Sequence, residues 1–408
     1  MLGALCGGAL LVAIGAFGLV LRVVGSSPGD RPVETSAPSS SSAPPPSPMA
    51  SAVPAPSERA EVPANEQAAS PSPPAASTTP CALGGSARVV APKAHIRTGV
   101  EAVAAHNRIA LGFVVADKDG LAITLDPTSL GVTATAKHHS HDPIKRLVPE
   151  LNRKSVVAVA DSDHKGDRIA LARTVGGDSS FVLGEAEGKL VWGAQANDAP
   201  QTIWALESDA PVEALRAVAL EDGGDAVAFR QGTAIYLGAI HADKTPMGQL
   251  SQVPGLGPQI GSPALAVSGN TVMVVWADRA AASDPWMLRL LRWQPGEAPG
   301  APRAFAIPPG GLGEQAMSPG IAGVLGARFL LSWTEGPVAS HQVRAQTLAA
   351  SGDPLGTPLT ISGEGINAGQ GQPAVLPDGN GLVAYMASPA GGTAEVVATP
   401  VLCPASAP

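Results

Sequence analysis

The sequence has few cysteines, few aromatic residues and few charges. Its 408 residues include 3 Cys, while aromatic residues make up 3% and charged residues 15%. The net charge of −8 leaves no basic footprint, so nucleic acid is not an expected partner. Ala, Val and Leu dominate a hydrophobic fraction of 45%, which is enough apolar material for a large core.

Long amphipathic helices and nucleotide-binding loops are also missing. The 47 Gly and 40 Pro favour short strands and turns. There is no phosphate loop, and the Gly-rich run at 255–261 has the wrong spacing for a dinucleotide. Three histidines at His138, His139 and His141 predict a solvated connection rather than a metal site, because adjacent residues face opposite sides of a strand. We therefore expect neither a metal nor a cofactor.

The first 21 residues, MLGALCGGALLVAIGAFGLVL, carry no charged side chain. About 20 apolar residues span a bilayer as a helix, so residues 1–24 are predicted to anchor the chain in a membrane. A cleaved signal peptide is the alternative, but its basic start and small-residue cleavage site are missing. Lipidation at Cys6 is rejected because the bulky Leu5 precedes it. The missing basic start would also fit a chain that continues a longer cytoplasmic part.

Residues 25–80 are rich in Pro, Ser and Ala and almost free of large apolar side chains. Such a segment cannot bury enough surface to offset its chain entropy, which predicts a disordered linker. When extended it would hold a domain on the order of 100 Å from the membrane. We interpret it as a stalk; a tail without function is the alternative.

Residues 81–403 repeat one pattern of strands. In three late repeats a Pro opens an apolar strand, a Gly-containing turn follows, and a second strand ends in an aromatic residue. The marks of these repeats are Pro263, Pro319 and Pro373, then Trp276, Trp333 and Tyr385. Their spacing is about 54 residues. The earlier segments 107–125, 155–175 and 216–240 each read as antiparallel strands joined by Asp/Gly turns.

Repeats of this length with three or four strands are typical of β-propeller blades. Residues 81–403 would hold about six blades, or seven if the early repeats are shorter. We therefore predict an all-β fold: a β-propeller of six blades, preceded by a transmembrane helix and a disordered linker. Residues 404–408 are predicted to be a disordered tail.

The repeated Pro–strand–turn–strand–Trp pattern resembles the sialidase-like and WD40-like repeat propellers of secreted or membrane-anchored bacterial proteins. The resemblance covers about residues 81–403 and implies a propeller without an assigned activity. Two marks of these groups are absent: the Ser-x-Asp-x-Gly-x-x-Trp box of true sialidases and the Gly-His…Trp-Asp pair of WD40 blades.

Closure of the ring brings two cysteines together. The segment 86–96 reads as a strand that would complete the last blade beside the strand at 393–403. Cys81 and Cys403 would then lie close to each other, and we predict a disulfide between them, with two unpaired buried thiols as the alternative. Such a bridge requires an oxidising compartment.

Three carboxylates follow aromatic-ended strands and are candidates for one rim of the propeller: Asp278, Asp284 and Glu335. Two carboxylates at a suitable separation can hydrolyse glycosides, although such positions are more often plain loop residues. The aromatic residues Trp276 and Trp333 are expected to pack in the core.

The leading functional hypothesis is a non-catalytic binding or scaffolding protein of the bacterial cell envelope, held in the membrane by residues 1–24. It would present the propeller outside the cytoplasm to an unknown protein or glycan ligand. A secreted protein is the alternative location. The alternative functions are a propeller hydrolase acting on glycans or peptides, and the sensor domain of a receptor whose cytoplasmic part is missing from this chain.

Overall fold

The computed structural model describes residues 78–96, 98–105, 107–151, 155–162, 170–173, 180–186, 189–193, 201–206, 210–313, 315–389 and 393–404. The predicted anchor at 1–24 and nearly all of the predicted linker and tail lie outside these residues. Every regular element in the described ranges is a strand, so none of them supplies a helix that could cross a bilayer.

The described strands form seven sheets, and neighbouring strands within each sheet are antiparallel. The first three sheets in chain order contain β3 (Val100–Ala105), β4 (Arg108–Ala116), β5 (Asp119–Leu125) and β6 (Val132–His139); β7 (Ile144–Leu151) and β8 (Val156–Ser162); β9 (Ala170–Arg173), β10 (Ser180–Ala186), β11 (Lys189–Gly193) and β12 (Gln201–Ala205).

The next three sheets contain β13 (Val212–Ala219), β14 (Asp225–Gln231), β15 (Ala234–Ile240) and β16 (Ser251–Gln252); β17 (Gln259–Ile260), β18 (Ala264–Ser268), β19 (Thr271–Arg279), β20 (Met287–Trp293) and β21 (Arg303–Ala304); β22 (Ala316–Val324), β23 (Arg328–Glu335), β24 (Gln342–Ala349) and β25 (Pro354–Thr360). The last sheet joins both ends of the domain and contains β26 (Asn367–Val375), β27 (Asn380–Ser388), β28 (Glu395–Leu402), β1 (Ala82–Leu83) and β2 (Arg88–Ala91).

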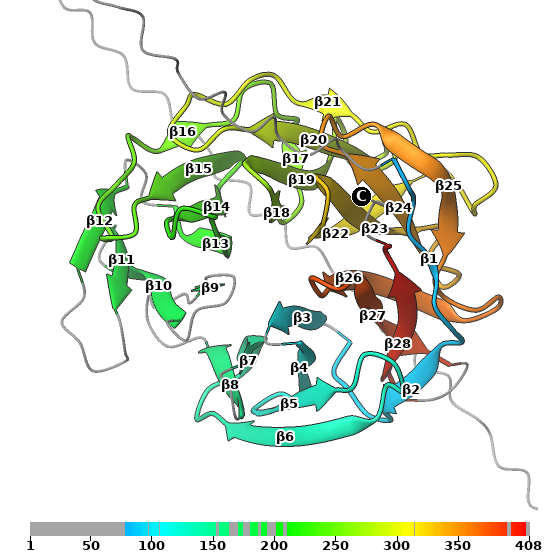
Figure 1. The fold of residues 1–408 in the computed structure, drawn as a ribbon. Coiled ribbons are helices and arrows are strands. Elements are labelled where there is room, and N and C mark those ends of the chain that lie inside the picture. The colour runs from blue at the N-terminus through cyan, green and yellow to red at the C-terminus, as the bar shows by residue number, and fades with distance from the viewer. Residues whose placement is uncertain are drawn as a thin grey trace, which may run out of the picture. The chain divides into compact units, whose positions relative to one another are not determined.

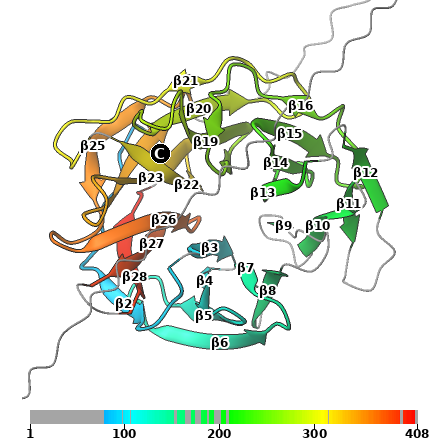
Figure 2. The same ribbon diagram turned by 180° about the vertical axis from the view of Figure 1, so that it is seen from behind.

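The sheets follow one another around a ring, with β3, β7, β9, β13, β18, β22 and β26 nearest its middle (Figures 1 and 2). Hydrophobic cores lie between neighbouring sheets: one joins Trp276 of β19 to Leu237 of β15, and another joins Trp333 of β23 to Leu288 of β20. This arrangement is a β-propeller, as predicted. The segment at 86–96 contributes β2, which pairs with β28 and closes the ring as expected.

The predicted number of six blades is wrong, because the described residues form seven sheets. The segment 155–175, read as one hairpin, is divided between two of them: β8 pairs with β7, whereas β9 pairs with β10. The spacing of about 54 residues was measured on the late repeats, whose strands are joined by longer loops. This spacing therefore overestimates the number of residues in an early sheet. The sheet of β3 to β6, for example, lies within Val100–His139.

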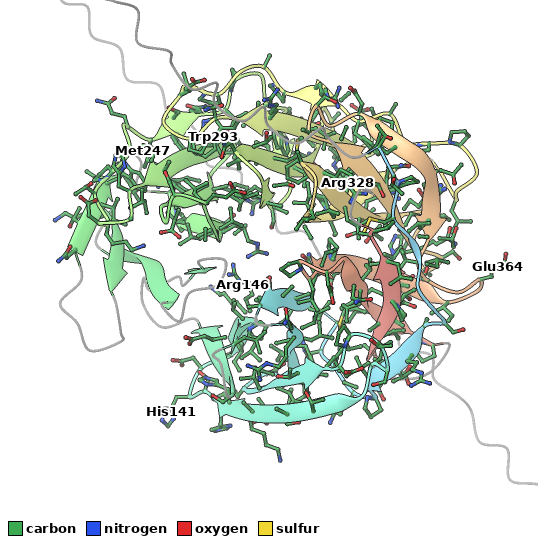
Figure 3. The ribbon with its side chains drawn as sticks, viewed as in Figure 1. His141, Arg146, Met247, Trp293, Arg328 and Glu364 are labelled. Carbon is green, nitrogen blue, oxygen red and sulfur yellow. A yellow bond between two sulfur atoms is a disulfide. The ribbon has the colours of Figure 1, made fainter. Side chains whose placement is uncertain are left out.

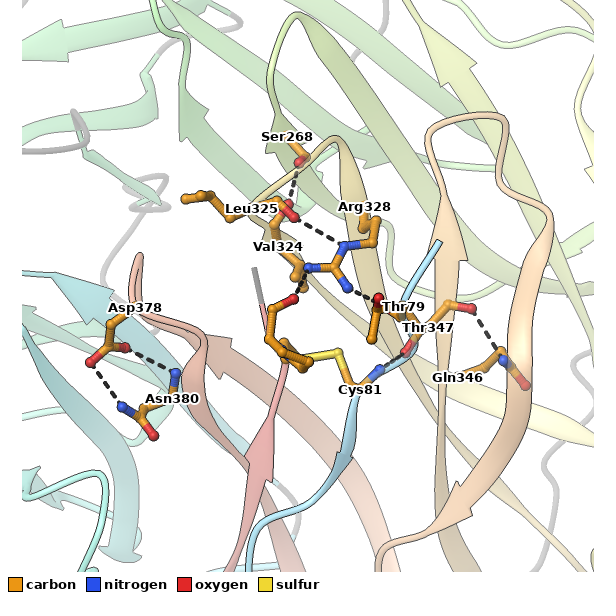
Figure 4. The surroundings of a disulfide bond; sticks show 12 residues. Thr79, Cys81, Ser268, Val324, Leu325, Arg328, Gln346, Thr347, Asp378 and Asn380 are labelled. Atoms are coloured by element: carbon orange, nitrogen blue, oxygen red, sulfur yellow. Dashed lines mark hydrogen bonds between the residues drawn. A yellow bond between two sulfur atoms is a disulfide. The ribbon is translucent and has the colours of Figure 1, made fainter. Parts of the chain in front are cut away.

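The predicted disulfide between Cys81 and Cys403 is present and fastens β1 to the end of β28 (Figure 4). Both cysteines are buried. The backbone N–H of Cys81 donates to Thr347 Oγ1 at 2.8 Å, and that of Cys403 donates to Gly379 O at 2.8 Å. The bridge is thus anchored to β24 on one side and to the β26–β27 turn on the other.

Arg328 lies fully buried beside the disulfide and donates only to backbone carbonyls among the described residues (Figure 4). Its Nη1 donates to Thr79 O, its Nη2 to Pro404 O at 2.7 Å, and its Nε to Leu325 O at 3.0 Å. One guanidinium group therefore holds the chain just before Cys81 and just after Cys403. We call Arg328 and the Cys81–Cys403 disulfide the terminal clasp.

Asp225 predicts a pH dependence of stability. The side chain is fully buried at the start of β14, with Oδ2 2.8 Å from Lys244 Nζ. Burial raises the pKa of Asp225 to about 6, despite the opposing charge of Lys244. Because the folded state holds this proton more tightly than the unfolded state, stability falls as pH rises from about 4 to about 6 and is then level.

Between pH 4 and pH 6 this raised pKa should lower the free energy of unfolding by roughly 3 kcal/mol. The Asp225→Asn variant lacks the titrating group and should not show this loss. Urea unfolding of both proteins at pH 4, 5, 6 and 7 measures the difference. Parallel pH profiles for the two proteins would contradict the assignment to Asp225.

Candidate functional site

The three predicted rim carboxylates are not brought together at the centre of the ring, and none of them lines the central cavities. Asp278 is buried, and its Oδ1 lies 2.8 Å from Arg289 Nε. Glu335 is also fully buried and accepts a hydrogen bond from Trp333 Nε1 at 2.8 Å. Asp284 is half-buried in the loop before β20. Two of the three carboxylates are therefore buried and form an ion pair or a hydrogen bond within the fold.

The histidine run at 138–141 also differs from the prediction. His138 and His139 are the last residues of the outer strand β6 rather than part of a connection. His139 Nδ1 lies 2.7 Å from Asp119 Oδ1 on the neighbouring strand. Within the described ranges, no three His, Cys, Asp or Glu side chains are grouped so that they could hold a metal ion.

Two adjoining cavities lie at the centre of the propeller. The mouth cavity has a volume of about 390 Å³ and the inner cavity about 300 Å³. Glu101, Arg216, Ala264 and Gln372 line both of them. The inner cavity is otherwise walled mainly by small residues of the inner strands. At one of these, Gly323, a Cβ would lie 1.9 Å from a backbone oxygen of β18, so only glycine permits this approach of β22.

Three charged side chains from separate inner strands meet at this centre. Glu101 comes from β3, Arg146 from β7 and Arg216 from β13. The Oε1 atom of Glu101 lies 3.3 Å from Arg146 Nε and 3.1 Å from Arg216 Nη2. Figure 3 shows Arg146 near the middle of the ring. We call these three residues the central triad.

The central triad is cationic and largely shielded from solvent. The side chains of Glu101, Arg146 and Arg216 are 19%, 13% and 23% exposed. Arg146 Nη1 also donates to Leu215 O at 2.7 Å, which fixes the guanidinium group. Two guanidinium groups face one carboxylate, so the described charged residues of the two cavities sum to one positive charge. Such a site favours an anionic ligand, because guanidinium groups match the geometry of carboxylate and sulfate oxygens.

Neutral groups complete the mouth cavity. Trp286 lines it from the loop before β20, and Gln370 and Gln372 line it from β26. Gln370 Oε1 is buried without a hydrogen-bond partner among the described residues, so it is an acceptor for a ligand hydroxyl. An aromatic face beside convergent polar groups suits a ligand with one apolar face and several hydroxyls, such as a sugar ring.

The inner strands share a bulge that aims these side chains. The register of β13, β22 and β26 shifts by the same step before Arg216, Gly320 and Gln372. The bulges place residues with positive φ (48–58°) at Ala214, Ser318 and Gln370. Each bulge lies opposite a buried aromatic residue of the next strand. An alignment of the repeats on that aromatic residue places Arg216 and Gln372 at equivalent positions, both facing the centre of the ring.

Comparison with known proteins gives similarity of fold without similarity of sequence. No family model and no curated protein sequence matches the chain. A protein of unknown function from Dyadobacter fermentans shows 13% identity and a TM-score of 0.48 over 78% of this chain and 99% of that one. The subtype N11 neuraminidase-like protein of A/flat-faced bat/Peru/033/2010 (H18N11) shows 10% identity and a TM-score of 0.47 over 78% and 90%.

An endo-arabinase from Bacteroides thetaiotaomicron shows 12% identity and a TM-score of 0.39 over 78% of this chain and 97% of the arabinase. The propeller that the sequence resemblance implied is confirmed by the ring of antiparallel sheets. The solved structures that match also include a thermostable family-43 glycoside hydrolase. The leading prediction of a non-catalytic scaffold is corrected, and the alternative of a propeller hydrolase replaces it as a proposal that rests on the residues of the site. At these identities the likeness concerns the fold, so the chemistry rests on the site.

Proposed function

We propose that the chain is a propeller hydrolase that acts on an anionic glycan in the mouth cavity. The observation that carries this proposal is the central triad, one carboxylate held between two guanidinium groups. Glu101 and Arg216 line both the mouth cavity, which is large enough for a sugar unit, and the inner cavity, which Arg146 also lines. Arg146 and Arg216 would bind an acidic group of the sugar. Trp286 would lie against the sugar ring, and Gln370 Oε1 would accept a hydrogen bond from a sugar hydroxyl.

Glu101 is the one carboxylate among the described residues that line the two cavities. In glycoside hydrolysis a carboxylate beside the sugar ring stabilises the positive charge that develops at the anomeric carbon. The two guanidinium groups keep Glu101 oriented for this role. A second acid, which would protonate the leaving oxygen, is not among these described lining residues.

The location outside the cytoplasm is part of the same proposal. The disulfide between Cys81 and Cys403 supports it, since disulfides persist in oxidising compartments. Anchoring by residues 1–24 in a bacterial cell envelope remains a prediction.

The proposed function predicts that Glu101→Gln lowers kcat by about 100-fold or more while ligand binding persists. Arg216→Gln is expected to raise KM about tenfold, because one charge-assisted contact to the acidic group is lost. Release of reducing ends from a panel of uronate-containing, sulfated and neutral glycans measures both effects.

Glu297→Gln, which changes an exposed carboxylate in the loop after β20, is the matched control and should behave as the unmodified chain. The proposal would be overturned if no glycan of the panel is cleaved, or if cleavage is unaffected by Glu101→Gln.

A further inference from the structure

A stacked pair of side chains links the mouth cavity to a larger cavity farther out. The Cζ atom of Arg279 lies 4.5 Å from the ring centroid of Trp286. Trp286 lines the mouth cavity, whereas Arg279 lines an outer cavity of about 920 Å³. A ligand that extends beyond the mouth cavity therefore meets Trp286 first and Arg279 next.

Arg279 is held in a fixed orientation, and no carboxylate of the described residues forms an ion pair with it. Its Nε donates to Gln259 Oε1 at 2.7 Å, and its Nη1 donates to Ala282 O at 2.8 Å. Arg289 at the same sheet, in contrast, pairs with Asp278. Arg279 is thus a preorganised cation at the edge of a cavity, and its Nη2 group remains to contact a ligand.

We infer that the site binds an oligosaccharide that carries more than one acidic group. This inference rests on the proposed function and specifies its substrate class. One acidic group binds at Arg146 and Arg216, the sugar between them lies against Trp286, and a second acidic group binds at Arg279. The substrate is therefore a polyanionic chain, such as a polyuronate or a sulfated glycan, rather than a single terminal acidic sugar.

Among the described residues, the outer cavity is lined by one opposing charge. Asp284 lines it together with Arg279 and Gln315. A carboxylate near a bound polyanion repels it, so removal of this charge should strengthen binding of the chain. Arg279 and Asp284 hence provide substitutions with opposite expected effects in one cavity.

Calorimetric titration of the full chain with galacturonic acid, tetragalacturonate, a sulfated tetrasaccharide and a neutral tetrasaccharide tests the inference. At least one acidic tetramer is expected to bind about tenfold or more tightly than the monomer. Arg279→Gln should remove that gain and leave monomer binding unchanged, whereas Asp284→Asn should increase tetramer affinity. Arg292→Gln, an exposed arginine on β20, is the matched control.

The outcomes separate the two proposals. If an acidic tetramer binds no more tightly than the monomer, or if Arg279→Gln leaves its affinity unchanged, the extended site is refuted while the central site stands. If neither the monomer nor any acidic tetramer binds, the proposed function itself is refuted. Thermal unfolding of each variant confirms that the fold is retained.

Discussion

Removal of the disulfide, by the paired substitutions Cys81→Ser and Cys403→Ser, is expected to lower the free energy of unfolding by about 5 kcal/mol. The two cysteines are 322 residues apart in the sequence, so the bridge restricts nearly the whole domain in the unfolded state. Denaturant unfolding of the full chain, with and without the substitutions, measures the loss.

A reducing agent gives the matched control for this experiment. It should destabilise the unmodified chain by a similar amount and leave the double variant unchanged. If reduction and substitution both leave the unfolding midpoint where it was, then the sheet contacts of β1 and β2 close the ring without the disulfide.

Replacement of Glu335 by Ala is expected to cost about 3 to 5 kcal/mol, because it leaves a buried cation without its partner. Glu335 Oε1 lies 3.5 Å from Arg344 Nη1 and accepts the backbone N–H of Leu312 at 2.9 Å. Its Oε2 accepts Trp333 Nε1 at 2.8 Å, and both charged side chains are almost fully buried. Two buried side chains, Trp333 and Arg344, and the backbone N–H of Leu312 therefore lose their acceptor at once.

Asp284→Asn provides the comparison, since Asp284 was predicted on the same grounds as Glu335 but lies half-buried. Its substitution should change the free energy of unfolding by less than about 0.5 kcal/mol. Denaturant unfolding measured at one pH for both variants tests the contrast. A cost near zero for Glu335→Ala would show that Arg344 finds another partner.

The propeller and its closure could be predicted from the sequence because they depend on repetition. Pro263, Pro319 and Pro373 are each followed by an aromatic residue at a similar distance. In each repeat the Pro predicts the start of the innermost strand, and the aromatic residue predicts the end of the second strand. The disulfide follows because a closed ring must bring its two ends together. The blade number does not follow, because loop length varies between repeats and a spacing measured on three of them cannot be extended to the rest.

Two of the three predicted rim carboxylates are buried for a reason that the strand geometry explains. Side chains alternate between the two faces of a strand, so a residue two positions after a buried aromatic faces the same side. Asp278 follows Trp276 in this way, and Glu335 follows Trp333. Both carboxylates consequently point into packed interior, where Arg289 and Arg344 neutralise them.

The central triad could not be predicted because its members come from three strands far apart in the sequence. Glu101, Arg146 and Arg216 lie in three short strands that share no motif. The position of Arg216 is occupied by Gly320 and by Gln372 in the corresponding repeats. The strands of the fold are therefore repeated, but the side chains of the site are not. The three residues come together only because the ring closes.

The terminal clasp makes residues 81–403 a covalent circle. A single protease cut in any surface loop would therefore leave the two fragments joined through Cys81 and Cys403. The inner strands would also remain arranged around the central triad. Such a nicked chain would run as one species on a non-reducing gel and as two after reduction. Tolerance of one cut would suit the proposed location outside the cytoplasm.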